Sequence, residues 1–336
     1  MAFDTIRLEK GLYTTGRSFT GALETLDPSE QYKGTALEGL DAYQRQLKRF
    51  DIRVSGAGSS PVEKFFATTD SAALFPEYVS RAVRQGMEEA DLLPSVVAAT
   101  TEIDGLDYRA VESVPTDADK ELSVVAEGAS IPETVVRTQE NLVKLRKRGR
   151  MLTASYEAIR FQKLDLFTIT LKQIGAYIAR TQFADAVEVL RNGDGNNNAA
   201  PTSDIADTSG HVIAYSDLVD FWNLFSPYTL RTVIASPAVV AALLKLSEFK
   251  DACAGFNFQS TGKMITPLGA ELLRSGAAQD GELIGLDNTC ALEMVKAGDV
   301  TTEFDKLIDR QLERAAITMT AGFSKIFKDA SRVLSI

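Results

Sequence analysis

The side chains that could carry out catalysis are few in this sequence, and they stand far from one another. The single histidine, His211, follows Gly210 and has no GxSxG or HExxH pattern around it. Cys253 and Cys290 lack the CxxC spacing of a zinc or redox site. Carboxylates are so numerous, at 46, that no pair stands out by its spacing. We therefore expect no enzyme, no catalytic residue, no cofactor and no metal site.

One loop carries the alternating oxygen atoms that calcium prefers, at Asp194, Asn196 and Asn198. A calcium-binding loop of the EF-hand type that began at Asp194 would need an acidic ligand at position 205. Ile205 stands there. The pattern therefore favours an ordinary solvated loop between residues 193 and 210.

The charge of the chain argues against a protein that reads nucleic acid. Its net charge is −10, whereas such proteins need a basic face that displaces counterions from phosphate. Residues 61–130 hold 5 basic and 14 acidic side chains, and residues 131–163 hold 8 basic and 3 acidic ones. An acidic block beside a basic one can pair within the chain or with another copy, or both can be solvated surface.

Composition indicates a folded protein made in a reducing, cytosolic place. About 45% of the 336 residues are apolar and 24% are charged, enough for a sizeable core. Apolar runs such as Val239–Leu244 are too short to span a bilayer, and Met1–Leu8 has no secretory pattern. The two cysteines give no disulfide framework.

The first sixty residues are polar and rich in glycine, and the spacing predicts one helix there, at Ala36–Phe50. Ser55–Pro61 has the composition of a flexible joint. This pattern is more typical of a mobile arm with few contacts than of a compact domain.

The next stretch predicts a helix that Pro76 opens and that runs to Met87, followed by strands. Thr134–Leu152 alternates like one long strand, and its middle is basic on both faces. Because unpaired charges are costly in a core, we expect this strand to project as one arm of a β-hairpin. The other arm is Leu106–Val125.

The strongest helix pattern runs from Leu164 to Leu190, with Gly175 as its only glycine, and ends at Asn192–Gly195. A compact α/β alternation follows, with Ser216 and Ser236 as N-caps. The elements that we expect in it are a helix at Asp217–Leu224, a strand at Arg231–Ala235, a helix at Ala238–Leu246, and strands at Glu282–Leu286, Ala291–Met294 and Arg314–Thr320.

This order of elements resembles the major capsid proteins of tailed bacteriophages, which have the Hong Kong 97-type (HK97-like) fold. The fragments that carry the resemblance are ALFPEYVSRAVR at residues 73–84, AEGASIP at 126–132, ASYEAIR at 154–160 and ASPAVVAALL at 235–244. The resemblance covers residue 73 to the C-terminus, and its specificity lies in the order and spacing of the fragments.

The resemblance implies an α+β fold with an N-terminal arm, an extended β-hairpin (the E-loop), a peripheral domain with a long spine helix, and an α/β axial domain. The boundaries that it implies are an arm at 1–72, a first part of the peripheral domain at 73–100, the E-loop at 101–152, the spine helix and peripheral domain at 153–211, the axial domain at 212–305, and a return to the peripheral domain at 306–336.

The resemblance also implies a function and partners. The chain would assemble with itself, as pentamers and hexamers, into an icosahedral shell that encloses double-stranded phage DNA. Its other partners would be a portal protein, possible scaffold, protease or decoration proteins, and DNA held without sequence preference, with no membrane. It would be assembled in the host cytoplasm and reside in the virion. The alternative is a shell protein of an encapsulin-type cellular compartment, and a further one is an enzyme whose site the sequence does not reveal.

Contacts between copies of the chain would involve the basic strand. We hypothesise that its basic side chains meet acidic ones of an adjacent subunit, among them Glu121, Glu127 and the cluster Glu88–Asp91. The basic residues are Lys144, Arg146, Lys147, Arg148 and Arg150.

Overall fold

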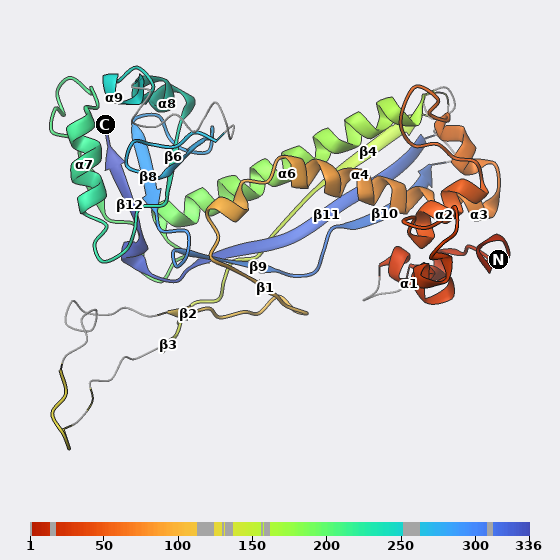
Figure 1. The fold of residues 1–336 in the computed structure, drawn as a ribbon, viewed down its shortest axis with the longest axis horizontal. Coiled ribbons are helices and arrows are strands. Elements are labelled where there is room, and N and C mark those ends of the chain that lie inside the picture. Colours follow the sequence, from red (N-terminus) through yellow and green to blue (C-terminus); the bar gives the residue numbers. More distant parts are fainter. Residues whose placement is uncertain are drawn as a thin grey trace. The chain divides into compact units, whose positions relative to one another are not determined.

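The computed structural model describes residues 2–13, 18–112, 124–129, 131, 137–155, 157, 162–250, 263–307 and 312–336 (Figure 1). By its internal contacts the chain forms two compact units. The first unit consists of Met1–Ala90, Arg148–Ala179 and Val300–Met319. The second unit consists of Asp91–Lys147, Arg180–Asp299 and Thr320–Ile336.

The N-terminal part of the first unit is a packed set of helices. Its α-helices are α1 (Phe19–Leu26), α2 (Ala42–Arg49), α3 (Thr69–Ala72) and α4 (Phe75–Glu89). Ser18 caps α1 through the Gly21 amide, and Asp41 forms a capping box with Gln44 on α2. Apolar side chains from this region are buried, including Phe19, Leu23, Tyr43, Leu47, Val62 and Phe65.

The expectation of a mobile arm with few contacts is therefore wrong for the described residues of this region. Two of its glycines, Gly34 and Gly39, have φ of 76° and 81° and serve as turns rather than as flexible joints. The helix expected at Ala36–Phe50 begins only at Ala42, because Gly39 turns the chain just before it.

Helices α4 and α6 (Leu164–Asn192) cross with their backbones in contact in the first unit. A Cβ atom on Gly86 would lie 2.1 Å from the carbonyl oxygen of Lys172, and one on Gly175 would lie 2.1 Å from that of Val83. Glycine is therefore required at both positions. Phe75, Tyr78 and Phe167 form an aromatic cluster beside this crossing. The predicted helices at 76–87 and 164–190 are both confirmed.

A second set of strands pairs with the long strand β11. In the first unit, β10 (Thr301–Leu307) pairs antiparallel with residues 312–318 of β11 (Leu312–Lys325). In the second unit, residues 321–325 of β11 pair antiparallel with β9 (Leu292–Lys296), which pairs parallel with β1 (Ala99–Glu102). Strand β4 (Arg146–Ser155) also pairs with β11.

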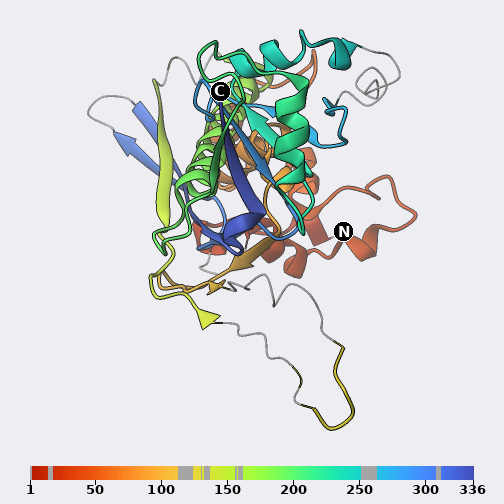
Figure 2. The ribbon, with the colours of Figure 1, turned by 90° about the vertical axis from the view of Figure 1, so that its left-hand side faces the viewer.

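The second unit contains a five-stranded α/β sheet (Figures 1 and 2). Helices α7 and α8 pack on one apolar cluster of this sheet, through Phe221 and Val239 among others. The strand order is β5 (Thr202–Asp204), β12 (Ser331–Ser335), β8 (Glu282–Leu286), β6 (Thr232–Ala235) and β7 (Glu271–Arg274), and the helices are α7 (Tyr215–Asn223), α8 (Pro237–Leu243) and α9 (Ser247–Lys250).

Most expected elements of this α/β part are present, with three differences. Ser236 caps α8 as expected, but Ala214 rather than Ser216 is the N-cap of α7, because the Asp217 carboxylate accepts from the Ala214 amide at 2.7 Å. Strands β5 and β7 of this sheet were not expected, nor was β10 of the first unit. The C-terminal strand β12 pairs with β8 in the α/β sheet, so the last residues do not join the return predicted for 306–336.

Candidate functional site

The base of the predicted hairpin is present in the second unit. Strands β2 (Val111–Glu112) and β3 (Arg137–Thr138) pair antiparallel, with Val111 opposite Thr138. Glu121 lies outside the described residues. Glu127 is exposed in a β-turn in which the Ala129 amide donates to the Ala126 carbonyl at 3.0 Å, and Gly128 supplies the positive φ of 78°.

The strand expected to project from Thr134 to Leu152 is not continuous. Among the described residues, it is divided into β3 and β4, and β4 lies along β11 instead of projecting. Gly149 permits this pairing, since a Cβ atom there would lie 2.6 Å from the Ile317 carbonyl oxygen. Among the described residues, the paired part of the expected hairpin is therefore limited to β2 and β3, and all five basic residues of the hypothesis lie outside these two strands.

Arg146 is paired within the chain. Its Nη1 atom lies 2.6 Å from Asp185 Oδ1 and 2.7 Å from Glu188 Oε2, both on α6. Hydrogen bonds to these two carboxylates raise the pKa of the guanidinium above its usual value, and the bond to Glu188 has the larger effect. Arg146 therefore neutralises its own spine helix, which the hypothesis of an intersubunit pair did not anticipate.

The other basic residues differ in their surroundings. In the first unit, the Arg150 guanidinium lies 5.7 Å from the ring centroid of Tyr177 on α6, and Arg148 is half-buried. Lys144 and Lys147 are exposed. The basic residues of this strand are thus accommodated in two ways. Arg146 and Arg150 contact side chains of helix α6, and Lys144 and Lys147 are exposed to solvent. Their proposed contacts with a neighbouring subunit stay a prediction.

Lys144 and Arg146 line a cavity of about 250 Å³ in the second unit. Asp185, Glu188 and Asp194 also line it, so charges of both signs meet there.

A buried polar cluster lies beside this cavity, which we call the hairpin-base cluster: Gln139, Asp194, Ser324 and Lys325. Gln139 is 2% exposed, and its Nε2 atom donates to Asp194 Oδ2 and to the Lys325 carbonyl oxygen, both at 3.1 Å. Ser324 Oγ donates to Asp194 Oδ2 at 3.0 Å, and the Lys325 amide donates to the same oxygen at 3.0 Å. The cluster joins the hairpin base, the loop after α6 and the end of β11.

The calcium-like pattern that the sequence analysis set aside includes Asp194 of this cluster and its neighbour Asn196. Their oxygens take part in internal hydrogen bonds, since Asp194 Oδ1 accepts from the amide and the side chain of Asn196. Among the described residues, no group of three or more potential ligands could hold a metal ion. Gln139, Ser324 and Lys325 were missed, because nothing in their local sequence marks them as partners.

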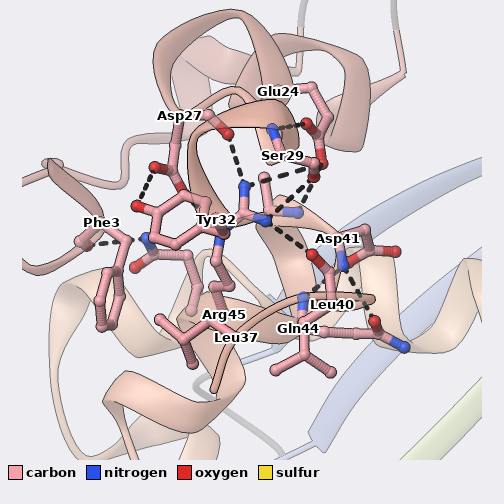
Figure 3. A network of polar contacts seen from close by, with 12 residues as sticks. Phe3, Glu24, Asp27, Ser29, Tyr32, Leu37, Leu40, Asp41, Gln44 and Arg45 are labelled. Atoms are coloured by element: carbon pink, nitrogen blue, oxygen red, sulfur yellow. Dashed lines mark hydrogen bonds and ion pairs between the residues drawn. The ribbon is translucent and has the colours of Figure 1, made fainter. Parts of the chain in front are cut away.

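A second buried polar cluster, the N-terminal cluster, lies in the first unit around Arg45 (Figure 3). Arg45 Nε lies 2.7 Å from Asp27 Oδ2, and both side chains are fully buried. Its other nitrogens donate to the carbonyl oxygens of Leu40 and Asp27 and to Ser29 Oγ, at 2.5–3.0 Å. The Tyr32 hydroxyl donates to Asp27 Oδ1 at 2.5 Å, and the Tyr32 ring lies 4.3 Å from the guanidinium.

The residues considered as catalytic candidates, His211 and the two cysteines, do not form a common site among the described residues. Exposed His211 has its Nδ1 atom 3.0 Å from the carbonyl oxygen of Ile336. Burial raises the pKa of the Cys290 thiol to about 11, which disfavours the reactive thiolate. Cys253 lies outside the described residues. Among the described residues, no helix is both long and apolar enough to cross a membrane.

Comparison with known proteins gives a family and a fold. A family described as phage capsid protein matches residues 138–313, which include β4, α6 and most of the α/β part. No curated protein matches the sequence.

Three solved structures are similar in fold. A virus-like particle from Pyrococcus furiosus is 15% identical, with 77% of this chain and 98% of that chain covered and a TM-score of 0.51. The capsid of a native GTA particle is 14% identical, with 73% and 90% covered and a TM-score of 0.53. Microbacterium phage Oxtober96 is 10% identical, with 73% and 91% covered and a TM-score of 0.52. The expected Hong Kong 97-type α+β fold is confirmed.

Proposed function

This chain belongs to the phage capsid protein family, and from this premise we propose that it is the major capsid protein that assembles into the icosahedral shell around a double-stranded DNA genome. The observation that carries the proposal is the family match to residues 138–313, which covers β4, helix α6 and every strand of the α/β sheet except β12. The likeness to particle-forming proteins supports the same fold. Its place is then the virion, after assembly in the host cytoplasm.

A shell subunit acts through surfaces rather than through an active site, and we propose that this chain has no catalytic activity. Copies of the chain would form pentamers and hexamers through large complementary surfaces. The exposed lysines Lys144 and Lys147 offer positive charge at the start of β4, and the acidic turn at Glu127 offers a negative counterpart. Such pairs set register and specificity more than affinity, since exposed ion pairs contribute about 0–1 kcal/mol each.

Portal, scaffold, protease or decoration proteins would complete the particle. The net charge of −10 suits a shell around packed DNA, since a strongly basic wall would hold the phosphates in place. DNA would therefore be enclosed without sequence-specific contacts.

The alternative is a shell of an encapsulin-type compartment, and the fold that this chain shares with the Pyrococcus furiosus virus-like particle is compatible with either kind of shell. The contents of the particle separate the two proposals. Particles purified from their natural source should protect a genome-length DNA from added nuclease. Particles that instead enclose a defined protein cargo and no DNA would support the compartment, and a stable monomer would contradict both.

A further inference from the structure

The hairpin-base cluster has a property that the role of a shell subunit does not require: its buried lysine can gain or lose a proton. We propose that Gln139, Asp194, Ser324 and Lys325 form a latch that fixes the base of the hairpin to the end of helix α6, and that the latch loosens when Lys325 is protonated. Its use in assembly rests on the proposed function, whereas the latch itself can be tested without any particle.

The hairpin side of the latch depends on Gln139 and its neighbours. The Gln139 amide donates to the Ala110 carbonyl at 2.9 Å, and the Val143 amide donates to the Tyr108 carbonyl at 2.9 Å. Asn141 reaches the loop after α6, where its Nδ2 atom donates to the Gly195 carbonyl oxygen at 2.9 Å. The hydrogen bond between Gln139 and Asp194 therefore ties both strands of the hairpin base to the loop after α6.

The opposite side of the latch depends on the end of β11 and helix α6. Lys325 is fully buried, and among the described residues its Nζ atom has one hydrogen-bond acceptor, the Leu190 carbonyl oxygen at 3.2 Å. Ser331 Oγ donates to the same oxygen at 3.1 Å. These donors satisfy a carbonyl group in the last turn of α6, which has no partner within the helix. An ammonium group carries three donors, so a single acceptor suits the neutral amine better.

Among the described residues, the charged groups near Lys325 lie on the elements packed against it. Asp194 lies in the loop after α6, Lys328 and Asp329 lie just after β11, and Glu293 of β9 is paired with Ser324 in the sheet. Glu293 accepts hydrogen bonds from Thr101 and Tyr108 instead of facing a cation. Burial and, to a smaller extent, Lys328 lower the pKa of Lys325 to about 7, against the opposing attraction of Asp194 and Asp329.

The direction of the pH effect follows from this lowered pKa. A lysine exposed by opening of the latch regains its ordinary pKa near 10.5, so the open state binds more protons between about pH 7 and 10.5. Opening is therefore favoured by about tenfold for each unit that the pH falls across this window, and it levels off below pH 7. The latch holds best at alkaline pH and is loosest below neutrality.

Burial would by itself raise the pKa of Asp194, but hydrogen bonds from the Lys325 amide, Asn196 and Ser324 outweigh it and hold this pKa below its usual value. Asp194 therefore stays ionised across the window, and Lys325 alone of the pair changes its charge.

Hydrogen exchange of the unassembled full-length chain at pH 7.5, 8.5 and 9.5 tests the latch. Amides that open independently of Lys325, such as those of helix α2, should exchange about 100-fold faster at pH 9.5 than at pH 7.5, because hydroxide catalyses exchange. At Gln139 and Val143 the opening falls as catalysis rises, so the observed rate should change by less than about tenfold.

Two variants provide the comparison. In Lys325→Met the rates at Gln139 and Val143 should regain the 100-fold rise, whereas the exposed Lys245→Met should behave as the parent chain. A 100-fold rise at Gln139 and Val143 in the parent chain would overturn the proposal. So would a flat profile that persists in Lys325→Met. The parent measurement decides the question even if the Lys325→Met protein does not fold.

Discussion

The two buried polar clusters solve the problem of a buried cation in opposite ways. In the N-terminal cluster, Arg45 meets the carboxylate of Asp27 directly at 2.7 Å and donates to three further oxygens. In the hairpin-base cluster, Lys325 donates to one carbonyl oxygen, and the bonds of Asp194 come from neutral groups and amides. Both Arg45 and Lys325 have no exposed surface.

The difference shows that the chemistry of the cation decides what a buried cluster can do. A guanidinium stays charged at every physiological pH and distributes five donors in a plane, so a saturated site around it is a permanent structural element. A buried lysine with too few hydrogen-bond acceptors instead loses its proton. The N-terminal cluster should therefore stabilise its region throughout the window from pH 7 to about 10.5, in which the hairpin-base cluster should respond to pH.

The largest expected effect is on the N-terminal cluster. Arg45→Met should lower the free energy of unfolding by about 3–5 kcal/mol, because it leaves the Asp27 carboxylate buried without its partner. Urea denaturation at pH 8 measures this loss. The control is Arg7→Met, whose exposed pair with Glu9 should cost about 0–1 kcal/mol. Equal losses in the two variants would show that the buried pair is not essential.

The second effect is the pH dependence of stability. The lowered pKa of Lys325 means that stability should rise between pH 7 and about 10.5, by at most about 1.4 kcal/mol per unit. The free energy of unfolding is measured against pH for the parent chain and for Lys325→Met, and the difference between the two slopes isolates this contribution. Arg45→Met should leave the slope unchanged. A parent slope that matches Lys325→Met would remove the contrast between the clusters.

A smaller loss is expected at Gln139. Gln139→Leu should lower the free energy of unfolding by about 1–3 kcal/mol, because Asp194, Asn196 and Ser324 each lose one hydrogen-bond partner in this largely buried cluster. Exposed Gln31→Leu is the matched control. Proteolysis of the hairpin should accelerate in Gln139→Leu alone, and unchanged proteolysis would mean that other bonds hold the hairpin base.

The smallest effect on stability is expected for the exposed lysines. Lys144→Glu combined with Lys147→Glu should change the free energy of unfolding by no more than about 1 kcal/mol, yet should prevent normal assembly. Lys33→Glu combined with Lys245→Glu is the control of equal charge change, also at exposed positions. Normal particles from the first double variant would exclude these lysines from the contacts between copies.

Structural features could be predicted from the sequence when the residues that interact in them lie close together along the chain. Helix α6, the strand β8 and the Ser236 cap were predicted, because their signals lie within a few neighbouring residues. The hairpin-base cluster joins Gln139 to residues 55 and 186 positions away, and no local pattern marks such partners.

The N-terminal region teaches the same lesson in a different form. Asp27 and Arg45 are 18 residues apart, and each alone reads as an ordinary surface charge. Glycine-rich composition suggested mobility, whereas the structure uses Gly34 and Gly39 as turns between packed elements. The two-sided basic strand was likewise misjudged, because helix α6 supplies carboxylates for Arg146 from some 40 residues away.

The size of the purified particle tests the central claim most directly. Electron microscopy of the expressed full-length chain should show closed shells of uniform diameter, built from pentamers and hexamers, with the hairpin of one copy in contact with another. A chain that remains a 36.5 kDa monomer or a small fixed oligomer under all assembly conditions would contradict the account.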